Sequence, residues 1–356
     1  MKFILKKITV FLIALSITFY THIPARCEDG NEILKKALET EGMVDLSGFC
    51  YTASLMKPYE FSNNVKVFWK RPGKTRMEYF SGNILQMIVI TTKDKSIEFS
   101  PAENIVYIKE ISPQKKELEK TKQSLLFSNY EAKIAGKETV SGRDATLVKV
   151  DSRYPDRPSK KLWIDDKTGT ILKSEQYSSS GNLIFLTYFK KINFNSVIND
   201  SFFMPPQGMS VRTVSEPKKK NFTPEDLSKL VGFKVVIPYS IPEGYVLEGC
   251  YVYQCGCGVD MAHMRFFDGL NSISIFEGKK DCPVCSKDKG MGFFRGRRGR
   301  MGMGRGRGMG CSPRECELLD RRQERVMAFT DKEIRFVIIG DIPESDANRI
   351  ADGLKK

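Results

Sequence analysis

The feature that most constrains the fold is a series of short segments in which apolar and polar residues alternate, separated by turn-forming residues. Val65, Val67 and Trp69 alternate with their neighbours, residues 71–74 form a turn with Pro and Gly, and Met77 and Tyr79 resume the pattern. The same signal predicts further strands at residues 84–91, 96–100, 105–109, 145–150, 161–164, 171–177 and 183–194. Such closely spaced strands predict an antiparallel meander.

Helical segments interrupt this meander at two places. Residues 31–41 carry apolar side chains on one helical face and stop at Gly42, and residues 114–127 form a charged helical stretch. A meander of so many strands must curl to hide its apolar face, and a helix can cover the opening. We therefore expect residues 28–203 to form one long, strongly curved, open antiparallel sheet with covering helices, in an α+β chain that is mainly antiparallel β.

A second, smaller α+β domain is expected at residues 225–356. Residues 204–224 are rich in Pro and Lys, which is typical of a linker. Beyond them the pattern predicts strands at residues 234–237, 245–254, 261–267, 272–277, 325–330 and 334–339, closed by a helix at 344–354. An insert at residues 279–316 interrupts this domain, and its stretch 290–310 is so rich in Gly and Arg that we expect it to be disordered.

The first 27 residues resemble a secretory signal peptide, with a basic start, an apolar centre and a processing region ending near Cys27. No later segment is apolar enough to cross a bilayer, so we expect an exported, soluble mature chain. The formal charge of +14 is concentrated in this leader and in the arginines of the insert. The folded domains are thus only mildly basic, which argues against a nucleic-acid binder.

Cysteines are concentrated in the last third of the chain. Six of them have ligand-like spacing, namely Cys255, Cys257, Cys282, Cys285, Cys311 and Cys316. An oxidising compartment favours disulfides among them, whereas reduced thiolates would form a zinc or soft-metal site. In the second case metal binding or thiol oxidation would make the insert a sensor. Six cysteines allow fifteen pairings, so the sequence names none.

Sequence motifs for catalysis are missing. His263, the one histidine beyond the leader, has no pattern of a nucleophile and base around it, and a structural role is expected. Asp165 and Asp166 resemble a carboxylate pair but fall in a turn, where Asp serves backbone hydrogen bonding. Phosphate loops, dinucleotide fingerprints and zinc-protease helices are lacking in the sequence. We therefore expect a binding protein and not an enzyme, with no cofactor unless the cysteines hold a metal.

Several motifs resemble the MucB/RseB family of periplasmic regulators of sigma-E. In the first domain they are residues 129–194, with 140–145, 161–165, 168–169 and 181–183 as the most similar stretches, and in the second they are residues 241–245, 267–276, 339–343 and 347–351. Residues 68–76 also resemble the strand-turn-strand of LolA-type lipoprotein carriers, whose half-barrel the MucB/RseB family shares. The cysteine-rich, Arg/Gly-rich insert departs from the usual pattern of the family.

The resemblance implies a periplasmic protein that binds the periplasmic segment of a membrane-spanning anti-sigma factor and releases it under envelope stress. An apolar groove in the half-barrel would sense lipid, lipoprotein or lipopolysaccharide. The alternative is a lipid or lipoprotein carrier of the LolA type, which needs no second domain. As groove candidates we select apolar residues of the early strands and one tryptophan: Val67, Trp69, Met77, Tyr79, Leu85, Met87 and Trp163.

Overall fold

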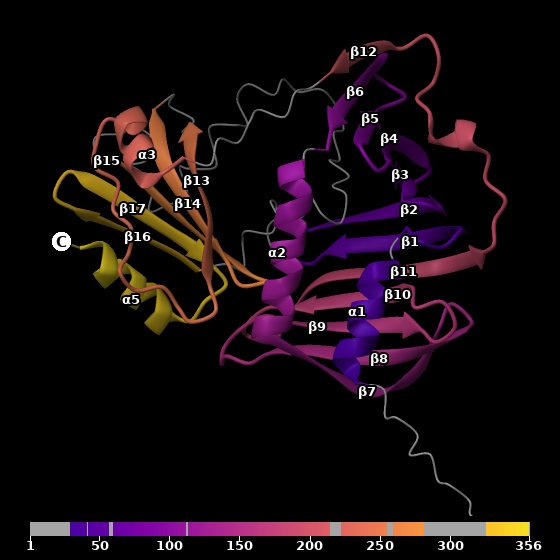
Figure 1. The fold of residues 1–356 in the computed structure, drawn as a ribbon, viewed down its shortest axis with the longest axis horizontal. Coiled ribbons are helices and arrows are strands. Elements are labelled where there is room, and N and C mark those ends of the chain that lie inside the picture. Colours follow the sequence, from indigo (N-terminus) through magenta and orange to yellow (C-terminus); the bar gives the residue numbers. More distant parts are fainter. Residues whose placement is uncertain are drawn as a thin grey trace, which may run out of the picture.

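A computed structural model describes residues 29–40, 42–56, 60–111, 113–213, 222–254, 259–280 and 325–355 of the chain. The described residues form two β-sheets, one of twelve strands and one of five, with helix α2 (Pro113–Asn129) between them (Figure 1). The expected signal peptide, the Arg/Gly-rich insert and the six clustered cysteines lie outside the described residues.

The twelve-stranded sheet follows the chain almost in order. Its strand order is β12-β6-β5-β4-β3-β2-β1-β11-β10-β9-β8-β7, and the two edge strands do not pair with each other. The strands are β1 (Leu46–Ser54), β2 (Phe61–Lys70), β3 (Lys74–Ser81), β4 (Ile84–Thr91), β5 (Lys95–Phe99), β6 (Ile105–Glu110), β7 (Tyr130–Val140), β8 (Arg143–Ser152), β9 (Ser159–Asp165), β10 (Ile171–Tyr177), β11 (Leu183–Phe194) and β12 (Ser210–Thr213). The predicted open half-barrel is confirmed.

Three strands of this sheet, β1, β7 and β12, were not predicted as strands, although β1 holds the sheet together. Strand β1 pairs with β2 on one side and with β11 on the other, so it joins the two halves of the sheet. Its sequence, LSGFCYTAS, has small residues where alternation would need apolar ones. Strand β7 is an edge strand whose residues 133–139 are all exposed, so it also lacks the alternation of apolar and polar positions.

The residues expected to form a linker, 204–224, contain strand β12. It pairs in parallel with β6, with Ser210 beside Ile105 and Thr213 beside Ile108. All four residues of β12 are exposed, which is why its sequence shows no apolar pattern. The chain therefore continues along the edge of the first sheet before it reaches the second domain.

Helix α1 (Gly30–Thr40) covers one end of the large sheet. Leu34 and Ala37 pack against Val148, Val150 and Leu162 of β8 and β9. A larger apolar cluster gathers residues from β1–β4 and β8–β11 and includes both tryptophans. A third cluster collects β4–β6 around Phe203 in the short 3-10 helix Asp200–Phe203. The long curved sheet thus has several separate packing centres instead of one.

The five-stranded sheet has the order β13-β14-β15-β17-β16. Its strands are β13 (Val246–Gln254), β14 (Asp260–Phe267), β15 (Ser272–Lys279), β16 (Arg325–Asp331) and β17 (Ile334–Gly340), and the helices α3 (Pro224–Val231) and α5 (Glu344–Leu354) pack on one face around Ile273 and Ile275. The expectation of a strand at residues 234–237 is wrong. The N–H of Val236 is donated to the carboxylate of Glu277 at 3.0 Å, so a side chain takes the place of a neighbouring strand.

Candidate functional site

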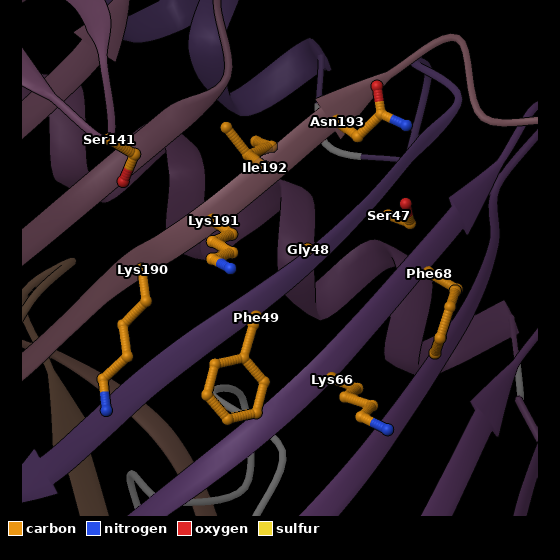
Figure 2. A pocket seen from close by; sticks show the side chains of 10 residues that line it. All are labelled: Ser47, Gly48, Phe49, Lys66, Phe68, Ser141, Lys190, Lys191, Ile192 and Asn193. Carbon is orange, nitrogen blue, oxygen red and sulfur yellow. The ribbon is translucent and has the colours of Figure 1, made fainter.

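An open hollow of about 870 Å³ lies over the middle of the large sheet, where β1, β2 and β11 run side by side (Figure 2). It is lined by Ser47, Gly48, Phe49, Lys66, Phe68, Ser141, Lys190, Lys191, Ile192 and Asn193. Ser141 comes from the turn between β7 and β8, and its hydroxyl donates to the carbonyl oxygen of Phe189. That contact brings a distant hairpin to the wall of the hollow.

Lysines and aromatic rings alternate around this hollow. The ammonium group of Lys190 lies 5.7 Å from the ring centre of Phe49 and 5.1 Å from that of Tyr51, and it donates to the side-chain oxygen of Asn64 at 3.0 Å. Lys66 lies 5.1 Å from the ring centre of Phe80. None of the ten lining residues is acidic. The surface therefore offers apolar rings together with unneutralised positive charge, a combination that suits an amphiphile with an anionic head.

A smaller hollow of about 300 Å³ follows along β11. Arg71, Arg143 and Lys167 line it together with Asp45 and Phe194. Two of its three cations already have partners, because Arg71 pairs with Asp45 at 3.3 Å and Arg143 pairs with Asp165. The site is thus less positive than its composition suggests.

The two neighbouring aspartates of the β9–β10 turn have structural roles. Burial raises the pKa of Asp165, but hydrogen bonds from Arg143 and Thr168 outweigh it, and the net pKa is lowered. Lys137 and Thr146 donate to Asp166 and lower its pKa. Both carboxylates are therefore held ionised by fixed partners, and the expected turn role agrees with these contacts.

His263 lies within an aromatic stack. Its ring is parallel to that of Phe276, with 4.2 Å between centroids, and tilted against Tyr251 at 5.8 Å. Within the described ranges no group of three or more His, Cys, Asp or Glu is placed to hold a metal ion. In the same ranges no helix is both long and apolar enough to traverse a bilayer.

The structure gathers most of the predicted groove residues into one cluster. Val67, Trp69, Tyr79 and Trp163 are buried members of it, at most 9% exposed, and Met77 and Met87 pack against them. Along β2, Val65, Val67 and Trp69 alternate with Lys66 and Phe68, so the first three point away from the hollow that the latter two line. The predicted residues form a packed interior, and their role as a ligand groove stays a prediction.

Leu85 lies apart from the other predicted groove residues. A bulge places Met87 opposite Tyr79 but Leu85 opposite Phe80, so Gln86 is the extra residue. The extra residue turns Leu85 to the other face, where it packs against the cluster of Ile88 and Ile90. A sequence pattern of period two carries no sign of such an insertion.

The lining residues Phe49 and Lys190 were not selected from the sequence. Phe49 lies in the unpredicted strand β1, but β11 contains a signal in the pair Lys190-Lys191, which interrupts an otherwise apolar strand. In the structure a bulge occurs at this point, because Cys50 pairs with Phe189 and Phe49 with Lys191. Lys190 is the extra residue, and its side chain lies over the hollow (Figure 2).

The described residues define an α+β protein with an open antiparallel half-barrel, a second, smaller sheet, and a hollow lined by lysines and aromatic rings. Residues 71–207 match the family model described as the MucB/RseB N-terminal domain. Over these residues the first domain of this chain is similar to the MucB/RseB family.

Solved structures agree over both domains. A crystal structure of MucB in complex with MucA(peri) matches with a TM-score of 0.55 and 16% sequence identity, covering 91% of this chain and 97% of that one. The Pseudomonas aeruginosa MucA/MucB complex matches with a TM-score of 0.55 and 14% identity, covering 90% and 96%. At these identities the likeness shows a shared fold. No curated protein matches the chain by sequence search.

Proposed function

We propose that this chain is a periplasmic regulator that binds the periplasmic segment of a membrane-spanning anti-sigma factor and carries out no catalysis. The observation that supports the proposal most is that the likeness to MucB chains crystallised with MucA extends over both domains and about nine-tenths of this chain. A carrier of the LolA type would need only the half-barrel. The second domain, with its own core, favours the regulator.

The test is a binding measurement with the full mature chain. The periplasmic segment of the anti-sigma factor from the same genome is titrated into the purified protein in a calorimeter, and a one-to-one complex is expected. In parallel, a purified lipoprotein is loaded onto the chain and its transfer to acceptor membranes is followed. Complex formation without transfer supports the regulator, whereas transfer without complex formation supports the carrier.

The hollow over β1, β2 and β11 is the proposed site of a lipid signal, which the family resemblance implies as lipid, lipoprotein or lipopolysaccharide. The rings of Phe49 and Phe68 supply apolar contact for methylene groups, each worth about 0.8 kcal/mol when buried. Lys66, Lys190 and Lys191 supply positive charge for an anionic head group. We propose that ligand binding here weakens the hold on the anti-sigma segment, and because coupling between two sites is reciprocal, the bound segment would weaken ligand binding by the same factor.

A charge reversal in the hollow tests the lipid proposal. A fluorescent fatty acid serves as the probe. Lys190→Glu is expected to weaken its binding severalfold, because the variant replaces a cation beside the hollow by a carboxylate that repels the carboxylate of the fatty acid. Lys133→Glu makes the same change on β7, away from the ten lining residues. Equal affinity in the two variants would refute the assignment of the lipid site to this hollow.

A further inference from the structure

The two domains contact each other through polar groups that are almost fully buried. Asn129, the last residue of α2, donates its side-chain N–H groups to the carbonyl oxygens of Gly244 at 2.8 Å and Asp268 at 2.7 Å. The next residue, Tyr130, donates its hydroxyl to the carboxylate of Asp268 at 2.9 Å. The side chains of these contacts are at most 5% exposed.

Charges of opposite sign meet around this centre. Arg157 of the first domain contacts Asp346 of α5 at 3.4 Å and lies 4.5 Å above the ring of Tyr245. On the neighbouring side of α2, Lys122 lies 3.6 Å from Glu248 of β13. The first domain thus contributes the cations of these pairs and the second contributes the carboxylates.

Two glycines of the second domain allow the close approach. A Cβ atom on Gly269 would lie 2.4 Å from the backbone nitrogen of Leu126 in α2, and one on Gly244 would lie 2.6 Å from the ring of Tyr154. Both glycines have positive φ, +109° and +86°, which other residues rarely adopt. The backbone of the second domain is therefore shaped for contact with the first.

Polar groups account for many of the connections in this contact, and Leu270 of the second domain adds apolar packing against the cluster around Tyr130. Water can replace the hydrogen bonds and ion pairs when the domains separate, so separation exchanges these polar partners for others. The closed arrangement also has a cost, because the side chain of Arg157 is only 4% exposed and has exchanged nearly all of its hydration for contacts with Asp346 and the ring of Tyr245. Water would solvate the guanidinium group in an open arrangement.

We propose that Asn129, Tyr130 and Arg157, together with Asp268 and Asp346, form a reversible polar latch, by which the protein changes between a closed arrangement of its domains and an open one. The closed arrangement is the one in Figure 1, with the C-terminal half of α2 held against the 268–271 turn. In the open arrangement the same groups are hydrated while each domain keeps its own core. The latch does not depend on which ligand or partner the protein binds.

The test uses the full mature chain and a variant that reverses the polarity of the central contact. Asn129→Asp has nearly the same shape but presents a carboxylate to the two carbonyl oxygens that Asn129 now donates to. Ser128→Asp places the same charge one residue earlier, on an exposed position of the same helical turn. Small-angle X-ray scattering gives the radius of gyration, and hydrogen exchange gives the protection of residues 122–130 and 268–271.

Asn129→Asp is expected to increase the radius of gyration and to accelerate exchange of these amides at least tenfold, with unchanged far-UV circular dichroism, whereas Ser128→Asp behaves as wild type. If Asn129→Asp fails to fold, Asp346→Asn is the decisive variant, with Asp352→Asn on the exposed side of α5 as its control. An unchanged radius of gyration and unchanged exchange in the folded variant, or the same change in its control, would overturn the latch.

Discussion

The two sheets of this molecule treat charged side chains in opposite ways. In the twelve-stranded sheet, Lys66 and Lys190 lie over aromatic rings beside an open hollow and remain within reach of solvent. In the five-stranded domain, the carboxylates of Glu277 and Asp268 are 0% and 1% exposed and accept hydrogen bonds from neighbouring segments. The first arrangement leaves charge available for a ligand, whereas the second uses buried carboxyl groups as hydrogen-bond acceptors that fix the chain.

The largest expected effect is a loss of stability when the core of the smaller domain is disrupted. Ile275 is 0% exposed in a cluster that joins the five-stranded sheet to α3 and α5. Ile275→Ala is expected to lower the free energy of unfolding by about 2–5 kcal/mol, because it leaves a cavity that this compact core cannot close. Ile84→Ala, at a position 69% exposed in the large sheet, should change it by less than about 0.5 kcal/mol. Urea unfolding measures both, and equal losses would contradict the assignment of the core.

The second prediction concerns the pH dependence that buried Glu277 imposes. Burial raises the pKa of Glu277 to about 8, although the N–H of Val236 acts in the opposite direction, against 4.5 for an ordinary glutamate. Between these two pH values the folded protein holds a proton that the unfolded chain has lost. The contribution of this proton to the free energy of unfolding is therefore fully present below about pH 4.5, and it decreases to zero as the pH rises from about 4.5 to about 8.

Glu277→Gln keeps an acceptor for Val236 but does not titrate. Relative to the variant, the wild type is expected to lose up to about 4 kcal/mol of stability between pH 5 and pH 9. Thermal unfolding across this range measures the difference. Parallel pH profiles for the two proteins would show that Glu277 is ionised in the folded state.

The third prediction returns to the hollow. A Cβ atom on Gly48 would lie 2.6 Å from the ring of Phe189 and 3.0 Å from the carbonyl oxygen of Lys191. Gly48→Ala is expected to destabilise the large sheet by about 1–3 kcal/mol, because the ring must move within a packed cluster. Ser62→Ala on the neighbouring strand β2 serves as the control, since Ser62 is exposed. Full stability of the glycine variant, measured by urea unfolding, would mean that the Phe189 ring is free to move.

The smallest effect compares two neighbouring aspartates at the end of the large sheet. Asp166 pairs with Lys137, whose side chain is 72% exposed, so Asp166→Asn should cost only about 0.2–1 kcal/mol. Asp165 is 2% exposed and accepts from Arg143 and Thr168, and Asp165→Asn should cost about 1–3 kcal/mol. Thermal melting of the two variants side by side tests this order, and the reverse order would contradict the contacts of the turn.

Patterns of period two and of helical period were sufficient to predict the class of fold and most elements. The helices predicted at residues 31–41 and 344–354 correspond to α1 and α5, and the alternation at Val65, Val67 and Trp69 corresponds to β2. These elements bury one face, and this one-sided burial appears in the sequence as a regular spacing of apolar residues. Strand β1 is half-buried along both of its faces and contains Gly48 and several small residues, so its sequence shows no regular spacing of apolar residues.

The candidate site was less accessible to sequence reasoning, because it depends on bulges and on contacts between distant segments. The bulge at Gln86 turned Leu85 to the opposite face, and the bulge at Lys190 placed a lysine over the hollow. The contact of Asn129 with Asp268 joins residues 139 positions apart, between domains that the sequence describes separately. Alternation within a strand carries information about neither kind of feature.

The central position of β1 has a consequence for the order in which the half-barrel can assemble. Ser54 pairs with Phe185 and Leu46 with Phe194, so one partner of the first strand is synthesised more than a hundred residues later. At about 5–20 residues per second, β1 leaves the ribosome on the order of ten seconds before β11. Until then the strands β1 to β6 and the strands β7 to β10 can form only as separate parts, with one edge of β1 open. Closure of the half-barrel is therefore a late, long-range step, and during that interval the open edge of β1 is the place where the chain is most exposed to pairing with a wrong strand.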